Sequence, residues 1–245
     1  MSPMVKDEDV ELSLVIPAYN EEQSIETCVR EADEVLARIG RPYEILVVDD
    51  GSTDGTFDRL RSLKKSVQRL RAVRFRENRG QTTAMAAGFE HARGETIVTM
   101  DADMQNDPAD IPLLLARMDE WDVVCGVRTS RRDSFTRKAS SAIANSVRNR
   151  LTHENIRDVG CTLRAYRRRY LLRVKLFEGM HRFLPTLLKL EGARVIEVPV
   201  NHRPRTKGAN KYGVANRLFK GLRDLYAVRW MQSRYMRYEV KEEIE

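Results

Sequence analysis

The chain has 245 residues, of which 42% are hydrophobic and 32% are charged, so it can bury a real core and is not an intrinsically disordered protein. Its formal net charge of +7 favours acidic partners such as nucleic acids, phosphorylated small molecules or an anionic membrane surface. Three widely spaced cysteines (Cys28, Cys125 and Cys161) argue against a disulfide framework and a zinc site, and suit a reducing compartment.

The amino-terminal residues carry neither the basic region nor the apolar core of a secretory signal. No run of about 18 apolar residues occurs anywhere in the chain. We therefore expect a cytoplasmic protein without a transmembrane segment, in which residues 1–11 form a polar tail.

The next part of the chain alternates between apolar and amphipathic segments. The apolar segments, which predict strands, are 12–16, 43–48, 70–75, 95–100 and 122–127. The segments between them, whose apolar residues recur at helical spacing, are 21–39, 56–67, 81–92 and 111–118. This alternation predicts a mostly parallel α/β sheet with helices on both faces.

The pattern changes after residue 128. The sequence there predicts helices at 134–151, 182–190 and 214–239, a strand at 194–200, and a strand followed by a helix within 164–174. We expect one main domain over residues 12–213, divided into halves 12–127 and 128–213, and a terminal helix and tail over residues 214–245.

Three polar loops follow three of the predicted strands, at 17–19, 49–52 and 101–103. Ligands of parallel sheets bind beyond the carboxyl ends of the strands, where these loops should meet. This convergence is the strongest pointer to a binding site in the sequence.

Asp101 and Asp103 stand one residue apart directly after an apolar run. Two carboxylates held together at the end of a buried strand repel each other unless a cation lies between them. Oxygen ligands of this kind suit Mg²⁺ or Mn²⁺, which commonly bridge to a substrate's phosphates. The alternative is an Asp-rich turn that binds nothing.

Four motifs occur in a fixed order, at 15–21, 47–56, 78–80 and 100–105. Together they resemble the family 2 glycosyltransferases with the GT-A fold, and the resemblance extends over residues 12–225. Within that family, Gln105 and the segment 198–213 are similar to polyprenyl-phosphate sugar transferases, a subgroup that includes dolichol-phosphate mannose synthases. The segment 181–183 is similar to the undecaprenyl-phosphate type.

The resemblance implies roles for individual residues. Those that would contact the base and ribose of the nucleotide are Pro17, Tyr19, Glu21, Val47 and Asp49. Those that would hold the divalent metal and the donor diphosphate are Asp101, Asp103 and Gln105, with Ala102 between the two carboxylates. Arg128, Arg205 and Lys211 would contact phosphates, and the implied catalytic residues are Asp103, Asp158, Arg205 and Lys211.

The implied reaction is inverting transfer of a sugar from a GDP-mannose or UDP-glucose type of donor to a polyprenyl phosphate. Such an acceptor is already an anion and needs alignment more than a general base. Asp158 is therefore either a catalytic base or a structural residue, such as a helix cap or an ion-pair partner of Arg164. Asp50 and Asp54 are either part of the site or turn and cap residues.

Residues 203–237 carry ten lysines and arginines and a single acid, Asp224. The predicted last helix combines this charge with apolar residues at near-helical spacing, which is typical of a helix that lies on a membrane surface. We expect a peripheral protein at the cytoplasmic face of a membrane, held by this helix or by a small membrane-anchoring subunit. The alternative is a helix packed on the domain with a solvated basic face.

Other functions remain open at this stage. A soluble family 2 glycosyltransferase with a glycan or protein acceptor would share the donor site, as would a nucleotide-sugar sensor without activity. A nucleic-acid-binding protein would explain the net charge, but it leaves Asp49, Asp101 and Asp103 without a role, and the chain lacks the stacking aromatic pattern of such proteins. We therefore expect no nucleic-acid partner.

Overall fold

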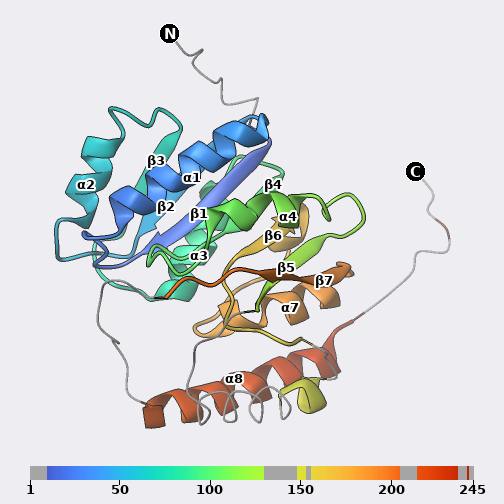
Figure 1. The fold of residues 1–245 in the computed structure, drawn as a ribbon. Helices are drawn as coiled ribbons and strands as arrows, with labels where there is room; N and C mark the ends of the chain where they lie inside the picture. Colours follow the sequence, from blue (N-terminus) through green and yellow to red (C-terminus); the bar gives the residue numbers. More distant parts are fainter. Residues whose placement is uncertain (1–9, 130–147, 153–155, 205–213, 237–241, 243–245) are drawn as a thin grey trace.

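A computed structural model describes residues 10–129, 148–152, 156–204, 214–236 and 242. Its centre is a seven-stranded sheet with the order β3-β2-β1-β4-β6-β5-β7 (Figure 1). The strands are β1 (Leu12–Ala18), β2 (Tyr43–Asp49), β3 (Leu70–Arg74), β4 (Thr96–Thr99), β5 (Val123–Arg128), β6 (Arg164–Arg167) and β7 (Val195–Val200). Only β6 runs antiparallel to its neighbours, so the mostly parallel sheet expected from the sequence is confirmed.

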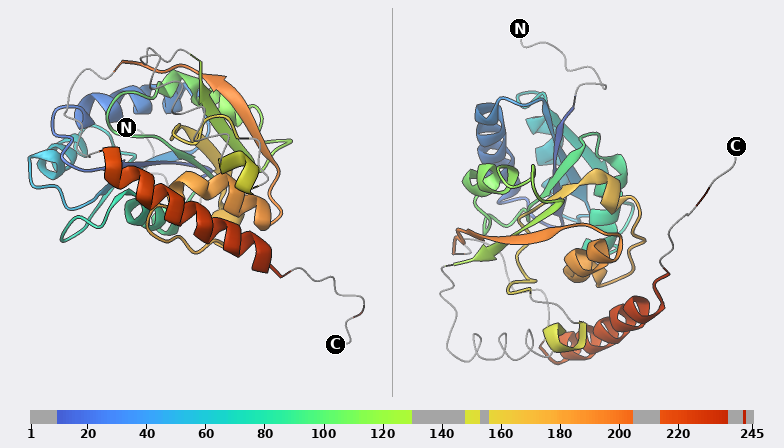
Figure 2. Two further views of the ribbon diagram at one scale, coloured as in Figure 1. Left: turned by 90° about the horizontal axis from the view of Figure 1, so that it is seen from below. Right: turned by 90° about the vertical axis from the view of Figure 1, so that its right-hand side faces the viewer.

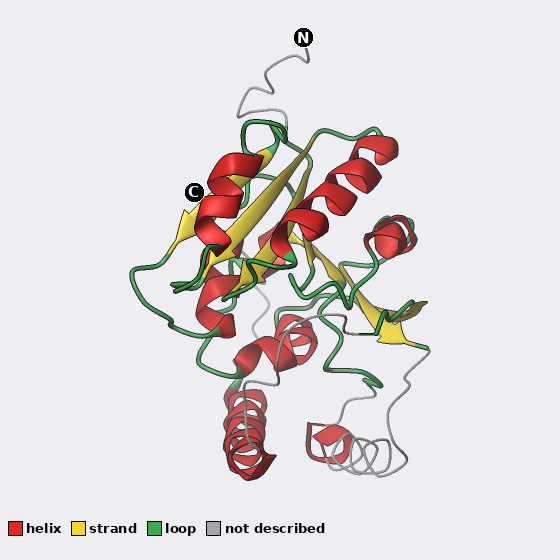
Figure 3. Cartoon of the chain, turned by 60° about the vertical axis from the view of Figure 1, so that its left-hand side comes forward, coloured by secondary structure: helices red, strands yellow, loops and turns green. Residues whose placement is uncertain are grey.

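Helices cover both faces of this sheet (Figure 3). One face packs against α1 (Ile25–Ile39), α2 (Thr56–Leu63) and α4 (Ile111–Leu115). The other face packs against α3 (Gln81–His91), α6 (Arg168–Leu171) and α7 (Leu184–Leu190). Short 3₁₀ turns at Pro108–Asp110 and Met180–Phe183 lead into α4 and α7.

The two cores explain the apolar runs of the central strands. In β2, Ile45 and Val47 belong to the core beneath α1, whereas Leu46 and Val48 belong to the core beneath α3. A strand that is covered on both faces needs apolar residues at every position rather than at alternate ones. The small residues of α3 allow it to pack close to the sheet. The approach is so close that a Cβ atom added at Gly88 would collide with Val15.

The structure corrects several predicted boundaries. β1 does not end at Pro17 but runs through it, paired with Val48 of β2. Val15 accepts a hydrogen bond from the backbone N–H of Met100, so Pro17, two residues on, faces β4 beyond its last paired residue and needs no N–H. α1 begins at Ile25 rather than at residue 21, and α3 ends before Ala92, so Gly94 is not its cap.

The second half of the chain agrees with the sequence where it is described. β6 and α6 are the strand and helix predicted within 164–174. Residues 148–152 are helical, and the rest of the helix predicted at 134–151 lies outside the described residues. The predicted tail over residues 1–11 also lies almost wholly outside them.

The last helix, α8 (Val214–Arg234), lies against the domain beside α7 (Figure 2). Leu225 and Val228 are buried against Met180, Phe183 and Leu187. On the other side, Leu222, Tyr226 and Trp230 are 51%, 76% and 58% exposed and recur at every fourth residue. One side of the helix therefore packs on the domain, as the alternative interpretation of the sequence expects, and the other side exposes apolar residues. Contact of this exposed side with a membrane stays a prediction.

No helix within the described residues has the length and apolar character needed to cross a bilayer.

A buried carboxylate joins the strands at their amino ends. Glu44, which is 3% exposed, accepts hydrogen bonds from the Ser13 hydroxyl at 2.6 Å and from the backbone N–H of Arg93 at 2.7 Å. Its other oxygen lies 2.5 Å from the guanidinium of Arg71 on β3. One side chain thus connects β1, β2, β3 and the turn before β4.

Replacing this residue should destabilise the fold. We expect Glu44→Ala to lower the free energy of unfolding by about 3 kcal/mol, because it leaves the partners of a buried ion pair unsatisfied. The matched control is Glu26→Ala, which removes the exposed pair with Arg30 at 3.0 Å and should cost no more than about 0.5 kcal/mol. Urea unfolding of the two variants measures both values, and equal losses would contradict the role given to Glu44.

Candidate active site

The loops after β1 and β2 are joined by hydrogen bonds at the carboxyl edge of the sheet. The backbone N–H of Asn20 donates to the Ser52 hydroxyl at 2.9 Å, and that of Glu21 donates to the Thr56 hydroxyl at 2.8 Å. The amide oxygen of Asn20 in turn accepts from the backbone N–H of Thr53 at 2.8 Å. Two of the three polar loops predicted to converge therefore form one unit.

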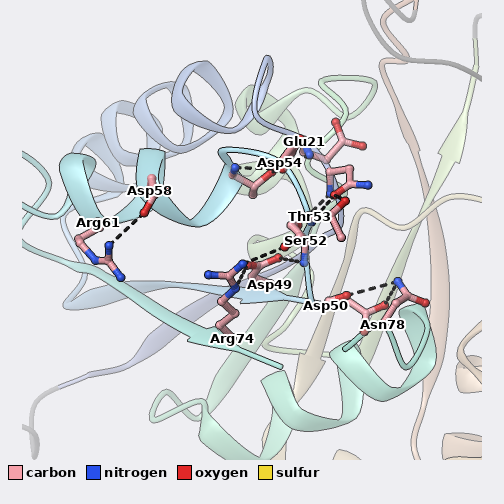
Figure 4. Close-up of polar contacts among 12 residues, drawn as sticks. Glu21, Asp49, Asp50, Ser52, Thr53, Asp54, Asp58, Arg61, Arg74 and Asn78 are labelled. Atoms are coloured by element: carbon pink, nitrogen blue, oxygen red, sulfur yellow. Dashed lines mark hydrogen bonds and ion pairs between the residues drawn. The ribbon is translucent and has the colours of Figure 1, made fainter. Parts of the chain in front are cut away.

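Asp49 and Asp50 point to opposite sides of β2 and have different partners (Figure 4). The carboxylate of Asp49 is fully buried, accepts from the backbone N–H of Ser52 at 3.0 Å, and lies 3.3 Å from Nε of Arg74 without hydrogen-bond geometry. Arg74 also donates to the Ser52 carbonyl at 2.8 Å. Asp49 is thus a fixed, ion-paired carboxylate that is buried at the carboxyl end of β2.

Asp50 and Asp54 have structural partners. Asp50 accepts hydrogen bonds from the backbone N–H groups of Arg79 and Gly80 at 2.7 and 2.9 Å, just before α3. Burial nevertheless raises the pKa of Asp50. Asp54 accepts from the backbone N–H and the hydroxyl of Thr56 at the start of α2. These contacts favour the turn and cap interpretation of both residues.

The turn after β4 holds the two carboxylates in place. Asp101 donates its backbone N–H to the Asn106 side chain at 3.0 Å, and its carboxylate accepts from the Gln81 amide at 3.0 Å. Asp103 accepts from the backbone N–H of Gln105 at 3.1 Å. Met104, which lies between Asp103 and Gln105, adopts φ = 66°, a left-handed conformation that is uncommon for a side-chain-bearing residue. The turn is therefore closed tightly around the two aspartates.

The negative charges of Asp101 and Asp103 repel each other. Partial burial and the charge of Asp103 raise the pKa of Asp101 to about 6, against the lowering effect of Arg128. A divalent cation would remove this repulsion, and two carboxylates with open positions for phosphate oxygens and water form a donor set that suits Mg²⁺ or Mn²⁺. The described residues contain no group of three or more His, Cys, Asp or Glu side chains around one point.

The segment after β7 is fastened to this turn. Arg203 donates its backbone N–H to the carbonyl of Gln105 at 2.9 Å, and its guanidinium pairs with Glu31 at 2.6 Å and Asp107 at 2.8 Å. The Gln105 amide lies 3.4 Å from Nε2 of His202. Arg205 and Lys211, the predicted phosphate-binding cations, lie outside the described residues.

Asp158 is paired with Arg128 rather than with Arg164, which corrects the ion pair considered from the sequence. Nε and Nη2 of Arg128 lie 2.7 and 2.8 Å from the two carboxylate oxygens of Asp158, and both side chains are largely buried. Arg164 instead donates to the Val159 carbonyl at 2.7 Å. Asp158 thus orients Arg128, because a bidentate pair fixes the plane of the guanidinium.

The remaining predicted residues differ in how close they come to this edge. Pro17, Tyr19 and Glu21 are partly exposed at the end of β1 and in the loop after it. Val47 and Ala102 are buried in the core beneath α1, so the structure does not bring their side chains to the surface of the site.

The sequence analysis did not identify several residues whose side chains contact the predicted site residues. Asn106, which is 5% exposed, accepts hydrogen bonds from the backbone of Asp101 and from the hydroxyl of Thr162, and so joins the turn to the loop that carries Asp158. Gln81 belongs to α3, and Arg74 belongs to β3. Only Asn106, which directly follows the predicted motif, offered a signal in the sequence.

Comparisons with known proteins agree with this geometry. The family model "Glycosyl transferase family 2" matches residues 13–174. The chain is 40% identical to the dodecaprenyl-phosphate galacturonate synthase of Rhizobium johnstonii, over 96% of this chain and 70% of that protein. It is 41% identical to the undecaprenyl-phosphate 4-deoxy-4-formamido-L-arabinose transferase of Klebsiella pneumoniae, over 82% of this chain and 62% of that protein. The chain thus spans about two thirds of the length of these relatives.

Solved structures share the fold at lower identity. The glucosyl-3-phosphoglycerate synthase of Mycobacterium tuberculosis, solved with Mn²⁺, uridine diphosphate and phosphoglyceric acid, has a TM-score of 0.66 at 20% identity, over 93% of this chain and 80% of that one. A mannosyltransferase of Pyrobaculum calidifontis has a TM-score of 0.62 at 20% identity, over 91% and 64%. With its GT-A-like sheet and the match over residues 13–174, the chain belongs to glycosyltransferase family 2.

Proposed function

We propose that the chain transfers a sugar from a nucleotide sugar to the phosphate of a polyprenyl carrier, with inversion at the anomeric carbon. The observation that carries this acceptor class is the 40% identity over 96% of the chain to a protein named for a dodecaprenyl-phosphate product. A glycan or protein acceptor is the competing outcome, and no contact in the described residues favours it over a lipid phosphate.

The donor would bind at the carboxyl edge of the sheet. Tyr19 and Glu21 border the site from the β1 loop, and Asp49 lies beneath it in a fixed pairing with Arg74. Asp101 and Asp103 would hold Mg²⁺ or Mn²⁺, with Gln105 beside them. When bound, the metal supplies the positive charge that stabilises a departing nucleoside diphosphate.

The acceptor phosphate requires alignment and positive charge. Arg128 lies at the end of β5, and its positive charge acts to lower the pKa of Asp101, against the larger raising effects of burial and of Asp103. In this proposal Arg128 orients phosphate oxygens, and Asp158 holds Arg128 rather than acting as a base. Arg205 and Lys211, which follow Arg203 in the sequence, would add further cations.

A lipid acceptor also requires contact with a membrane surface, and α8 supplies the features for it. Leu222, Tyr226 and Trp230 form an exposed apolar stripe on the side of the helix that faces away from the domain. Arg223, Arg229 and Arg234 are exposed beside this stripe. Tyr and Trp favour the boundary between lipid and water, and arginine favours anionic headgroups. We infer that α8 rests on the membrane that contains the acceptor.

The catalytic proposal is tested with purified protein, undecaprenyl phosphate and radiolabelled GDP-mannose, UDP-glucose and UDP-galacturonate, with Mg²⁺, Mn²⁺ or EDTA. We expect a labelled lipid from one donor only in the presence of metal. Asp103→Ala should lower turnover about a thousandfold or more, since the metal supplies several kcal/mol of charge stabilisation. The exposed Asp58→Ala on α2 should retain full activity. The absence of labelled lipid with any donor would overturn the proposal.

The role of Asp158 is tested by a double-mutant cycle with Arg128. If Asp158 acts only through Arg128, Asp158→Asn and Arg128→Gln should each lower kcat/KM, and the double variant should be about as active as Arg128→Gln alone. If Asp158 instead acts as a catalytic base, the losses in kcat/KM should be additive, and Asp158→Asn should change the pH profile of the reaction. Steady-state kinetics of the four proteins separate the two roles.

The membrane proposal is tested by co-sedimentation with vesicles that contain phosphatidylglycerol. Tyr226→Ser combined with Trp230→Ser should weaken vesicle binding roughly tenfold or more, because it removes two interfacial aromatic side chains. Leu113→Ser, which removes a side chain that is 52% exposed on α4, is the matched control and should bind as the wild type does. Equal binding by all three proteins would contradict the role of α8.

A further inference from the structure

The segment 179–183, which consists of Gly179 and the turn Met180–Phe183, lies between α3 and the last helix, α8, and the proposed reaction assigns it no role. On one side it packs against α8, where Met180 belongs to the same apolar cluster as Leu225. A Cβ atom added at Gly179 would collide with the carboxylate of Asp224, another residue of α8. Gly179 also has φ = 86°, a conformation that glycine adopts readily and other residues do not. The segment is therefore packed closely against α8.

On its other side the segment is fastened to α3 through Thr82, the second residue of that helix. Thr82 is only 5% exposed, and its hydroxyl accepts from the backbone N–H of Gly179 at 3.0 Å and lies 2.7 Å from Nδ1 of His181. A hydroxyl has one proton, which it can donate to an unprotonated ring nitrogen. One buried hydroxyl thus connects two positions of the segment to the first turn of α3.

His181 is suited to remain the partner of this hydroxyl over a wide range of pH. Burial, and after it the charges of Arg182 and Arg164, lowers the pKa of His181 to about 3. The imidazole is therefore neutral near neutral pH, and a neutral ring has one nitrogen free to accept a hydrogen bond. The carbonyl of His181 is also held, because it accepts from Nη1 of Arg164 at 3.4 Å at the start of β6. The contact between Thr82 and His181 is thus a permanent feature of the fold.

The residue before Thr82 contacts a predicted metal ligand. Gln81, the first residue of α3, has an exposed side chain that donates from Nε2 to the Asp101 carboxylate at 3.0 Å. The start of α3 is also held by Asp50, which accepts from the backbone N–H of Gly80 at 2.9 Å. The direction in which the Gln81 amide points therefore depends on the contacts that hold the first turn of α3, and Thr82 makes two of them.

We infer that Thr82 and His181 are positioning residues for the metal site. By holding the first turn of α3, they keep Gln81 where it orients the Asp101 carboxylate for a divalent cation. Groups that orient metal ligands through hydrogen bonds typically contribute a factor of about 10–100 to the affinity for the metal. This inference rests on the proposed metal-binding role of Asp101 and Asp103, and in it Thr82 and His181 contact neither the metal nor the substrate.

The test measures the affinity for Mn²⁺ directly, by electron paramagnetic resonance of the free ion, without nucleotide and with UDP. We expect the wild-type protein to bind Mn²⁺. Thr82→Val, which keeps the shape of the side chain but removes the hydroxyl, should weaken this affinity roughly tenfold. In the transferase assay, the same variant should need roughly tenfold more Mn²⁺ for half-maximal turnover and should approach the wild-type kcat when Mn²⁺ is saturating.

Three comparisons separate positioning from a loss of stability. Thr82→Ser restores the hydroxyl and should restore the affinity for Mn²⁺. Thr83→Val is the matched control, because it removes an exposed hydroxyl of the same turn that donates to the carbonyl of Arg79 at 2.9 Å, and it should bind Mn²⁺ as the wild type does. His181→Asn places a polar atom close to the position of Nδ1, which His181→Gln does not, so the Asn variant should bind Mn²⁺ more tightly. If Thr82→Val does not fold, the two His181 variants supply the same comparison.

A double-mutant cycle tests whether Thr82 acts through Gln81. If it does, Gln81→Ala should also weaken Mn²⁺ binding, and the double variant should bind about as tightly as Gln81→Ala alone. Additive losses, or Mn²⁺ binding by Thr82→Val that equals that of the wild type, would overturn the inference and leave the proposed transfer reaction standing. A wild-type protein that binds no Mn²⁺ would instead overturn the metal assignment of the proposed function, and this inference with it.

Discussion

The repulsion between Asp101 and Asp103 is the constraint around which the site is built. Two carboxylates this close at the end of a buried strand separate unless the surrounding residues prevent it. Asn106 and Gln81 hold Asp101, and the backbone of Gln105 holds Asp103 across a left-handed residue at Met104. The protein thus maintains an arrangement that is unfavourable without a cation, and the unfavourable electrostatic energy is what a bound metal would relieve.

The same turn contacts segments from much later in the chain. Asn106 accepts a hydrogen bond from Thr162, which lies in the loop that also carries Asp158, and Gln105 accepts one from Arg203 after β7. Asp110, next to the turn, accepts hydrogen bonds from the backbone and side chain of Asn201 at 2.6 and 3.0 Å. Residues far apart in the sequence therefore depend on one loop, so a displacement of the turn that carries Asp101 and Asp103 would also displace the segments that carry Asp158 and Arg203.

The sequence predicted the sheet and its carboxyl edge because their signals are local. Apolar runs, helical spacing and polar loops identified every strand and placed Asp49, Asp101 and Asp103 at strand ends. It failed where the outcome depends on tertiary partners. Whether Pro17 ends a strand depends on where β4 stops, and the partner of Asp158 depends on which of two arginines lies nearer in space. No periodicity reveals that Val47 turns towards α1, away from the exposed edge of the sheet.

The distribution of charge explains how a basic protein can place acids in a site for an anionic donor. Among the described residues, exposed arginines lie on α8 and at the opposite edge of the sheet, at Arg93, Arg169 and Arg194, whereas Asp49, Asp101 and Asp103 lie at the carboxyl edge. Without a cation, these acids would repel a nucleoside diphosphate. The long-range field of the chain attracts anions, but the local field at the turn rejects them. In the proposed reaction, binding of the donor at this edge would therefore be coupled electrostatically to binding of a divalent metal, because the placement of Asp101 and Asp103 makes the edge repulsive to a diphosphate until a cation is bound.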